Sequence, residues 1–256
     1  MERPDGVLIL TPVKDAARHL RGYFSALSRL TYPRRRLSLG FLESDSADDT
    51  LAALSGRLPE LRRHYRRVGL WKHDFGLRLP PGMPRWAPVA QIPRRAALAR
   101  SRNHLLLHAL DDEDWVLWLD VDVVHYPADV IERLLATGRA IVQPHCVKEP
   151  GGPTFDRNAW RHRGTLHMDQ LRGGPGLVRL DAVGGTMLLV KADAHRDGLV
   201  FPPFLYGGRS RLVRDSHPLV PGVAGEIETE GFGIMAADLG YSCWGLPDLE
   251  IRHADE

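Results

Sequence analysis

The first half of the chain alternates short apolar runs with segments of helical periodicity. The apolar runs have the length of strands and lie at 6–10, 37–43, 66–71, 115–120 and 140–146. The helical segments start after Asp15 and near Leu51, and cover 94–110 and 127–138, while 73–93 is expected to be a loop rich in Pro and Gly. Asp15 can cap the first helix. Strands separated by helices predict an α/β fold with a mostly parallel central sheet and helices on both faces.

The second half differs in composition. Residues 149–177 and 202–225 are rich in Gly, Pro, Arg and His and show little periodicity. Residues 179–193 are typical of two strands joined by a Gly-Gly bend, and 225–241 are typical of a helix. The final "LEIRHADE" predicts one more short strand. Because long irregular segments of a compact domain usually carry function, we expect part of the site in this half.

Aspartates follow several of the predicted strands. They are Asp15, Asp45, Asp120 and Asp122. Ligands of such sheets bind beyond the carboxyl ends of the strands, so these side chains should meet at one site. Asp120 and Asp122 lie two apart in "VLWLDVDVVHYP", a spacing that puts both on one side of a strand. A cation such as Mn²⁺ or Mg²⁺ would offset their repulsion. The alternative is a polar strand end with solvated carboxylates.

Two motifs could contact a nucleotide. Asp45 follows the second strand, where α/β nucleotide sites often place an acid, although it could instead cap a helix, as could Asp48 or Asp49. Either Arg100 or Arg102 could reach a diphosphate from the 94–110 helix, since a guanidinium fork matches phosphate oxygens. The alternative for both arginines is an ordinary surface position.

Three further features fall in the second half. Gly184 and Gly185 would let the backbone approach a ligand closely, or would simply form a tight turn. Glu228 and Glu230, at the entry to a predicted helix, could act on a substrate or merely favour the helix N-terminus. His253 is one of twelve histidines and could ligate a metal or be an ordinary surface or core residue.

Composition narrows the classes of protein. Hydrophobic residues make up 43% and charged residues 26% of the 256 residues, which predicts a packed globular protein. The net charge of +2 is too balanced to indicate nucleic-acid binding. Cys146 and Cys243 are too few for a zinc ribbon or a disulfide framework, and no apolar run reaches the length of a membrane span. We therefore expect a cytoplasmic protein, with peripheral membrane contact conceivable through arginine clusters such as "PRRR" (33–36).

In order along the chain, these motifs resemble a nucleotide-sugar glycosyltransferase of the GT-A fold. More narrowly, the sequence is similar to the fungal mannan-polymerase α-mannosyltransferases, glycosyltransferase family 62. The segments that carry this resemblance are "ILTPVKDAARHL", "LSLGFLESDSADDT", "WVLWLDVDVVHYP", "FDRNAWR", "VGGTMLLV", "IETEGFGIMAADLGY" and "GLPDLEIRH". They extend over nearly the whole chain.

The resemblance implies a role for each candidate residue. Asp122 and His253 would bind Mn²⁺ (or Mg²⁺), with Asp120 closer to the ribose or a metal-bound water. The residues expected to contact the nucleotide sugar are Pro12, Asp45, Arg100, Asp120 and Asp122. Gly184 and Gly185 would border the acceptor channel. Glu228 and Glu230 would lie near the reacting sugar and, with Asp122, take part in catalysis.

The implied reaction transfers mannose from GDP-mannose to an acceptor hydroxyl with retention of configuration. The acceptor would be a glycan, a lipid-linked molecule or a small molecule. We expect a single domain over 1–256, with a nucleotide-binding half (1–125) and an acceptor-binding and catalytic half (126–256). The fungal enzymes carry an N-terminal membrane anchor, for which this sequence shows no segment, so the compartment and acceptor cannot be transferred from them. Two alternatives stay open, a non-catalytic subunit of the same fold and a phosphatase of the haloacid dehalogenase type, whose D-x-D-x-[TV] motif "DVDVV" also fits.

Overall fold

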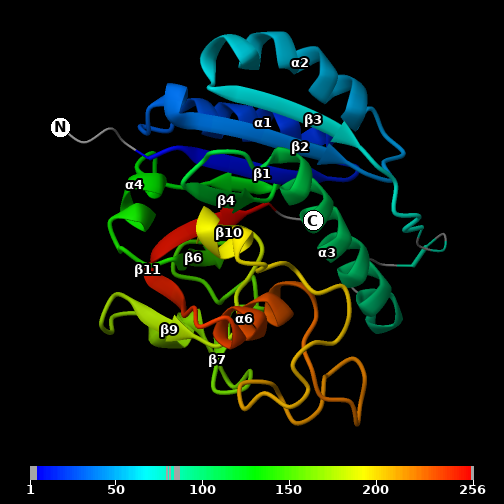
Figure 1. The fold of residues 1–256 in the computed structure, drawn as a ribbon, viewed down its shortest axis with the longest axis vertical. Helices are drawn as coiled ribbons and strands as arrows, with labels where there is room; N and C mark the ends of the chain where they lie inside the picture. The colour runs from blue at the N-terminus through cyan, green and yellow to red at the C-terminus, as the bar shows by residue number, and fades with distance from the viewer. Residues whose placement is uncertain (1–4, 79, 81, 84–86, 255–256) are drawn as a thin grey trace.

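The computed structural model describes residues 5–78, 80, 82–83 and 87–254, in which a nine-stranded sheet forms the centre of the fold (Figure 1). Eight strands follow the order β3–β2–β1–β4–β10–β6–β11–β5, and β9 pairs with β11 at the side. The strand bounds are β1 Val7–Val13, β2 Leu37–Glu43, β3 Arg67–Lys72, β4 Trp115–Leu119, β5 Val123–His125, β6 Ile141–Val147, β9 Val178–Leu180, β10 Met187–Lys191 and β11 Cys243–His253. A separate hairpin joins β7 (Trp160–Arg161) and β8 (Leu166–His167).

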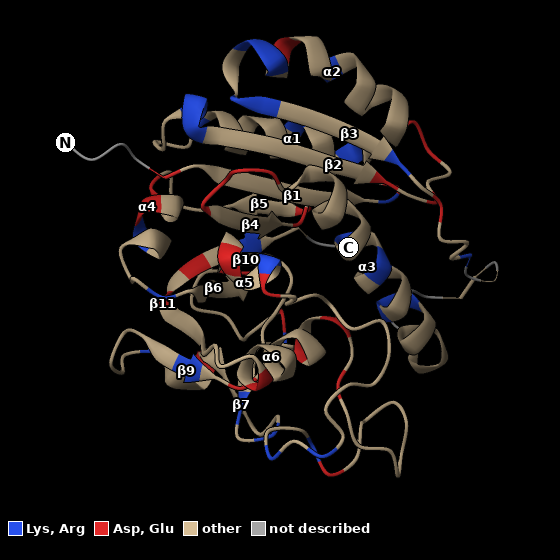
Figure 2. Cartoon of the chain, in the orientation of Figure 1, with Lys and Arg blue, Asp and Glu red and all other residues tan. Residues whose placement is uncertain are grey.

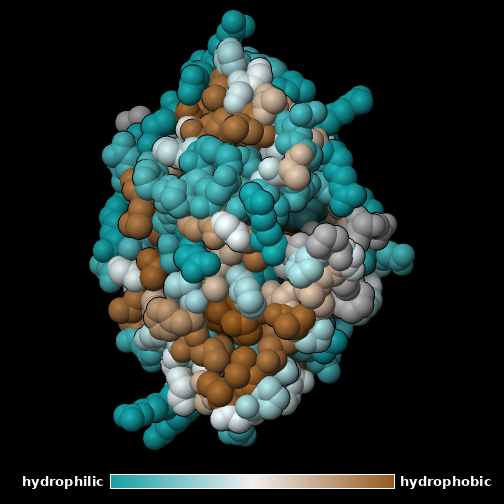
Figure 3. Space-filling view, turned by 90° about the vertical axis from the view of Figure 1, so that its right-hand side faces the viewer, coloured by the Kyte–Doolittle hydropathy of each residue, from teal (hydrophilic) through white to brown (hydrophobic). Residues whose placement is uncertain are grey.

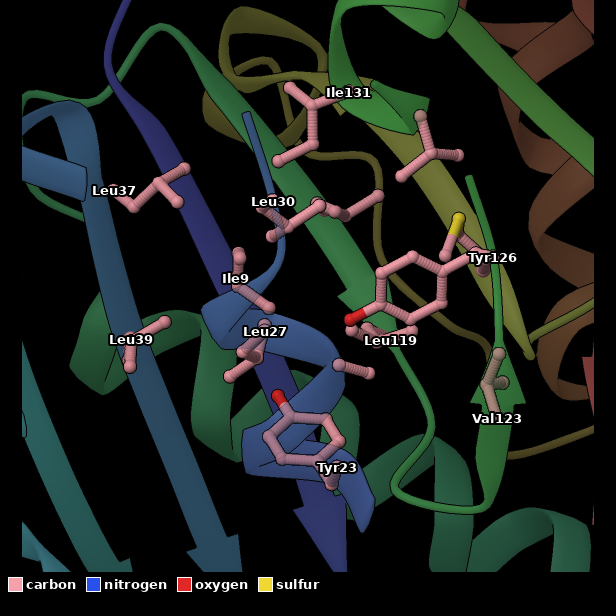
Figure 4. Packing of buried hydrophobic residues seen from close by; sticks show 14 of the residues in the cluster. Ile9, Tyr23, Leu27, Leu30, Leu37, Leu39, Leu119, Val123, Tyr126 and Ile131 are labelled. Atoms are coloured by element: carbon pink, nitrogen blue, oxygen red, sulfur yellow. The ribbon is translucent and has the colours of Figure 1, made fainter. Parts of the chain in front are cut away.

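Helices cover both faces of this sheet, as expected. The helix bounds are α1 Ala17–Ser28, α2 Thr50–His64, α3 Pro88–Ala109, α4 Val130–Leu135, α5 Ala192–Arg196 and α6 Glu228–Asp238, with short 3-10 helices η1 Arg34–Arg36 and η2 Met168–Leu171. In β1, Val7 and Ile9 pack under α1, α2 and α4, whereas Leu8 and Leu10 pack under α3, α5 and α6. Figure 4 shows the first of these two cores. The apolar runs are therefore strands buried on both faces, which is why they lack polar alternation.

The sheet is parallel where the site forms and mixed elsewhere. Strands β3, β2, β1 and β4 run parallel, as do β6 and β11. The expected parallel arrangement holds for these pairs, but β10 lies antiparallel between β4 and β6. The carboxyl ends of β1, β2 and β4 consequently share one edge of the sheet, where ligands of such folds bind.

Several predicted boundaries differ from the structure. Helix α3 begins at Pro88 instead of residue 94, because proline is compatible with the first turn of a helix. Helix α4 has only six residues, and β5 was not predicted. Strand β11 starts well before the predicted last strand. It includes Pro247, which lies where its register against β6 shifts between Leu246 and Glu250.

Asp15 does not cap the first helix, contrary to the prediction. The backbone N–H of Ala17 donates instead to a carboxylate oxygen of Asp48 at 3.1 Å. The Asp15 carboxylate accepts a hydrogen bond from the N–H of Ala47 at 2.7 Å, with Asp15 itself in the left-handed region at φ 49°. Asp15 therefore ties together the loops after β1 and β2, which leaves it beside the site.

Within the described residues, no helix combines the length and apolar character needed to cross a bilayer.

Candidate functional site

A cavity of about 430 Å³ opens at the carboxyl ends of β1, β2 and β4, against α3. Its lining includes four aspartates, which are Asp15, Asp45, Asp120 and Asp122, and four basic residues, which are Lys14, Arg18, Arg94 and Arg102. The predicted convergence of the aspartates is confirmed. All the lining residues precede residue 125, while the division of the chain into a nucleotide-binding and an acceptor-binding half stays a prediction. The balance of charges suits a ligand that is itself anionic and arrives with a cation.

Asp120 and Asp122 share this cavity through a turn. Strand β4 ends at Leu119, and the N–H of Val123 donates to the carbonyl of Asp120 at 3.3 Å. The two carboxylates do lie at one site, as predicted. The predicted reason, that alternate residues of a strand face the same side, was wrong because both aspartates follow the end of the strand. The turn leads into β5, which pairs with the end of β11.

That pairing brings Asp122 next to His253. The His253 Nε2 lies 3.1 Å from a carboxylate oxygen of Asp122. The other ring nitrogen, Nδ1, lies 2.7 Å from the carbonyl of Ala254, a geometry in which Nδ1–H donates and Nε2 faces the aspartate. Burial raises the pKa of Asp122, but the hydrogen bond and charge of His253 outweigh it and leave that pKa below its ordinary value. Burial likewise lowers the pKa of His253, and Asp122 outweighs it, so the net shift is upward.

Asp120 pairs with a buried arginine. Arg102 donates from Nη2 to Asp120 at 3.1 Å and from Nε to Glu228 at 2.9 Å, and its side chain is only 4% exposed. Its Nη1 is buried without a hydrogen-bond partner. Burial raises the pKa of Asp120 to about 6 against the opposing charge of Arg102. A buried, unsatisfied guanidinium N–H on a residue that lines the cavity marks a place for an anionic oxygen.

The arginine that reaches the aspartates is therefore Arg102. Arg100, chosen from the resemblance, is exposed and absent from the cavity lining. Arg102 lies three residues after buried Ala99 and three before buried Leu105, on the buried stripe of α3. Helical periodicity alone could have favoured it over Arg100.

The two other predicted nucleotide contacts line the cavity. Pro12 belongs to β1, and Asp45 follows β2 with a left-handed backbone at φ 53°. The Asp45 carboxylate accepts hydrogen bonds from the N–H groups of Phe75 at 2.9 Å and Gly76 at 3.0 Å. Asp45 thus orders the start of the segment after β3, and it does not cap a helix.

At positions 184 and 185, neighbouring side chains of the protein leave no space for a Cβ atom. A Cβ on Gly184 would lie 2.1 Å from a carboxylate oxygen of Asp156, and one on Gly185 would lie 2.5 Å from Nη2 of Arg102. Asp156 accepts hydrogen bonds from the N–H groups of Gly185 at 2.8 Å and Thr186 at 3.2 Å. Neither glycine lines the cavity. Asp156 was missed because it lies in a segment without periodicity.

Glu230 is held in a second buried cluster. It pairs with Arg95, accepts from Nη2 of Arg214 at 2.6 Å, and accepts from the indole N–H of Trp160 at 2.9 Å. Arg214 also pairs with Glu226, which is fully buried. Neither Glu230 nor Glu228 lines the cavity. The expected freedom of Glu230 to face a cleft is not observed, because its carboxylate is occupied by three donors.

The same cluster contains a possible set of metal ligands, His217, Glu226 and Glu230, whose ligand atoms lie within 4.8 Å of one another. The N–H of Leu219 donates to Nδ1 of His217 at 3.1 Å, which places the proton of the neutral ring on Nε2. Because that nitrogen is protonated, and Arg214 and Arg95 together already neutralise the two carboxylates, the chemistry of this cluster does not fit a cation.

The Asp122 and His253 pair does fit one. It offers a carboxylate and an imidazole whose Nε2 can lose its proton while Nδ1–H stays fixed on a carbonyl oxygen. These donors suit Mn²⁺ or Mg²⁺, with Asp120 close enough in sequence and space to bind a metal-ligated water or the ligand.

Comparisons with known proteins agree with this architecture. The sequence profile of the Anp1 family matches residues 1–172 and 167–205. A mannan polymerase II complex anp1 subunit of Schizosaccharomyces pombe is 31% identical over 98% of this chain, which spans 64% of that protein. A mannan polymerase complex subunit MNN9 of Candida albicans is 29% identical, with all of this chain covered and 76% of that protein.

Solved structures show the same fold. A mannosyltransferase of Pyrobaculum calidifontis, solved with GDP-Man and Mn²⁺, has a TM-score of 0.57 at 17% identity, over 98% of this chain and 57% of its own. GalNAc-T7 with UDP, GalNAc and Mn²⁺ has a TM-score of 0.60 at 14% identity, over 99% of this chain and 44% of its own. The GT-A prediction is confirmed, whereas assignment to glycosyltransferase family 62 stays a prediction. With a family profile over most of its length and relatives across all of it, this chain belongs to the Anp1 family.

Proposed function

We propose that this protein is a metal-dependent glycosyltransferase that transfers mannose from GDP-mannose to an acceptor hydroxyl with retention of configuration. The observation that carries the proposal is the contact between Asp122 and His253 at the edge of a charged cavity. Two residues far apart in the sequence form a carboxylate and imidazole pair where the fold family binds nucleotide sugars. The names of the relatives, subunits of mannan polymerase complexes, favour mannose.

In this proposal the acidic and basic residues of the cavity have different roles. A divalent cation held by Asp122 and His253 would supply Lewis-acid stabilisation to the departing diphosphate. Lys14, Arg18 and Arg94 line the cavity as further partners for phosphate oxygens. Arg102 would offer its unpaired Nη1 to the same oxygens while it holds Asp120 in place. For retention without a covalent intermediate, the acceptor hydroxyl would approach from the face that the diphosphate leaves.

The two glutamates have different prospects in this scheme. Glu228 is joined to the cavity through Arg102 and has a left-handed backbone at φ 57°, a strained conformation for a non-glycine residue. Such strain is often found at functional positions. Because Glu228 accepts a hydrogen bond from Arg102, we propose that it orients the Arg102 side chain. The Glu230 carboxylate interacts with Arg95, Arg214 and Trp160, and we propose that its role is structural.

Calorimetry of GDP binding with and without Mn²⁺ tests the metal and the base together. We expect binding that requires the metal, that is lost in Asp122→Ala, and that persists in Asp193→Ala, which removes an exposed carboxylate on α5. A clear preference for UDP over GDP would overturn the mannose assignment. Incubation with GDP-mannose and NMR of the anomeric carbon of the product would then establish transfer and its stereochemistry.

A non-catalytic subunit is the second candidate. It is favoured by relatives that are named as subunits of complexes and by the resemblance, at 28% identity over 77% of this chain, to a probable inactive glycosyltransferase 25 family member 3 of Bos taurus. An inactive subunit could still bind GDP, so transfer or donor hydrolysis is the discriminating measurement. If GDP·Mn²⁺ binds but neither transfer nor hydrolysis occurs, the non-catalytic function is correct. The phosphatase alternative is not supported, because the family and fold are those of glycosyltransferase-like proteins.

A further inference from the structure

Exposed apolar side chains occur at the start of α3, whose later turns line the cavity, and in segment 202–225. Three strongly exposed apolar side chains are Val89, 73% exposed at the start of α3, and Phe204 and Val223, 59% and 42% exposed in segment 202–225. We call these three residues the apolar rim. Figure 3 shows one side of the molecule, with a broad apolar area over its lower half.

The two segments are held together from inside. Arg95, in the second turn of α3, and Arg214, in segment 202–225, both pair with Glu230. This buried cluster therefore joins segment 202–225, through Arg214, to α3 and α6. Proline residues at 203, 218 and 221 further restrict the segment that carries Phe204 and Val223.

Unpaired cations accompany the apolar rim. Arg209 and Arg211 are exposed between Phe204 and Val223, beside a turn in which the N–H of Ser210 donates to the carbonyl of Gly207 at 2.7 Å. Within the described part of the chain neither arginine forms an ion pair, whereas the nearby acid Asp215 is paired with Arg163. Figure 2 shows that the loops along the bottom of the molecule carry both basic and acidic stretches. Segment 202–225 therefore carries both exposed positive charge and exposed apolar side chains.

We propose that this surface docks on a membrane containing anionic lipids, with the apolar rim inserted among the headgroups and Arg209 and Arg211 on lipid phosphates. A bilayer interface would bind both features, because its hydrocarbon core lies beneath negatively charged headgroups. Docked in this way, the cavity would open beside the membrane, within reach of an acceptor that is attached to lipid.

Vesicle flotation tests the proposal without any assumption about the donor. The full chain is mixed with phosphatidylcholine vesicles, with or without phosphatidylglycerol. We expect binding that increases with phosphatidylglycerol and weakens with salt. Phe204→Ser with Val223→Ser should reduce binding at least tenfold, and Arg209→Gln with Arg211→Gln should reduce binding to the anionic vesicles by roughly tenfold or more. Leu239→Ser is the matched control, because Leu239 is 43% exposed at the end of α6 and lies outside the apolar rim.

Thermal melting and GDP·Mn²⁺ binding of each variant show whether it is folded, and they separate this proposal from the proposed function. The proposal is overturned if the folded wild type does not float with anionic vesicles, or if Leu239→Ser loses as much binding as the variants of the apolar rim. It is also overturned if the wild type self-associates in solution, ignores vesicles, and becomes monomeric in the Phe204 and Val223 variant. That result would identify a second copy of the chain as the occupant.

Discussion

Replacing Glu230 by glutamine separates the two roles that this residue could have. Glu230 is 3% exposed and accepts from Arg95, Arg214 and Trp160. Glutamine keeps the shape of the side chain but removes its charge. Arg214 would still pair with Glu226, whereas Arg95 would lose its charge partner and keep neutral acceptors such as the Asn158 amide oxygen, at 3.0 Å.

The magnitude follows from the uncompensated charge. Breaking a buried ion pair by removing one partner costs about 3–5 kcal/mol. Because Arg95 is 17% exposed and Arg214 keeps a second carboxylate, we expect the lower end of this range, about 3 kcal/mol. For a domain of this size, that corresponds to a fall in melting temperature of roughly 6–12 °C.

Calorimetric melting of Glu230→Gln provides the measurement, with Glu60→Gln as the matched control. Glu60 is 61% exposed and pairs with Arg57 at 3.0 Å, so the same substitution should cost less than about 1 kcal/mol there. Our assignment predicts that Glu230→Gln melts early and still binds GDP·Mn²⁺. If it melts with the wild type but loses transfer activity, Glu230 is a catalytic residue and the structural assignment is wrong.

Three other predictions concern Gly184 and the Asp122–His253 pair. Gly184→Ala should destabilise the fold by about 1–3 kcal/mol because its Cβ would meet Asp156 at 2.1 Å, whereas Gly56→Ala, in open space on α2, should stabilise it slightly, and chemical unfolding of both variants decides. Metal-dependent GDP binding should weaken as pH falls through the raised pKa of His253, since a proton then competes for Nε2, and calorimetry between pH 5 and 8 would contradict this if the affinity were constant. Without metal, the Asp122–His253 ion pair should add stability between about pH 4 and 6.5, the ordinary pKa values of the two groups. This stability is lost as pH rises through the raised pKa of His253 or falls through the lowered pKa of Asp122, a profile that Asp122→Asn should flatten in melting experiments.

The elements that could be predicted from the sequence are those whose hydrophobic pattern is contained within a few consecutive residues. Strand β2 was predicted with its observed bounds because seven consecutive residues are buried on both faces. Strand β5 has three residues and no detectable pattern of its own, and it exists because β11 pairs with it. Helix α3 was started too late because Pro88 and Pro93 looked like loop residues, although α3 includes both.

The candidate site was predictable where a motif follows a strand, and less so where tertiary contacts select the residue. Asp15, Asp45, Asp120 and Asp122 all line the cavity because the topology brings strand ends together. Which arginine of α3 faces them follows from the buried stripe of that helix, which the choice of Arg100 from the resemblance did not take into account. Asp156, Arg95 and Arg214 act through contacts with residues distant in the sequence, so no local pattern could have identified them.

Because β11 carries His253, the candidate metal site can form only after β11 has joined the sheet. It spans residues 243–253, pairs with β5, β6 and β9, and ends at His253. Of the described strands it is the last to leave the ribosome, so a nascent chain can complete the aspartate half of the cavity well before its imidazole arrives. Until β11 pairs with the sheet, Asp122 lacks the partner that helps keep it ionised. Nascent or truncated chains should therefore bind the metal poorly, and metal affinity could report, during refolding, on the closure of the sheet.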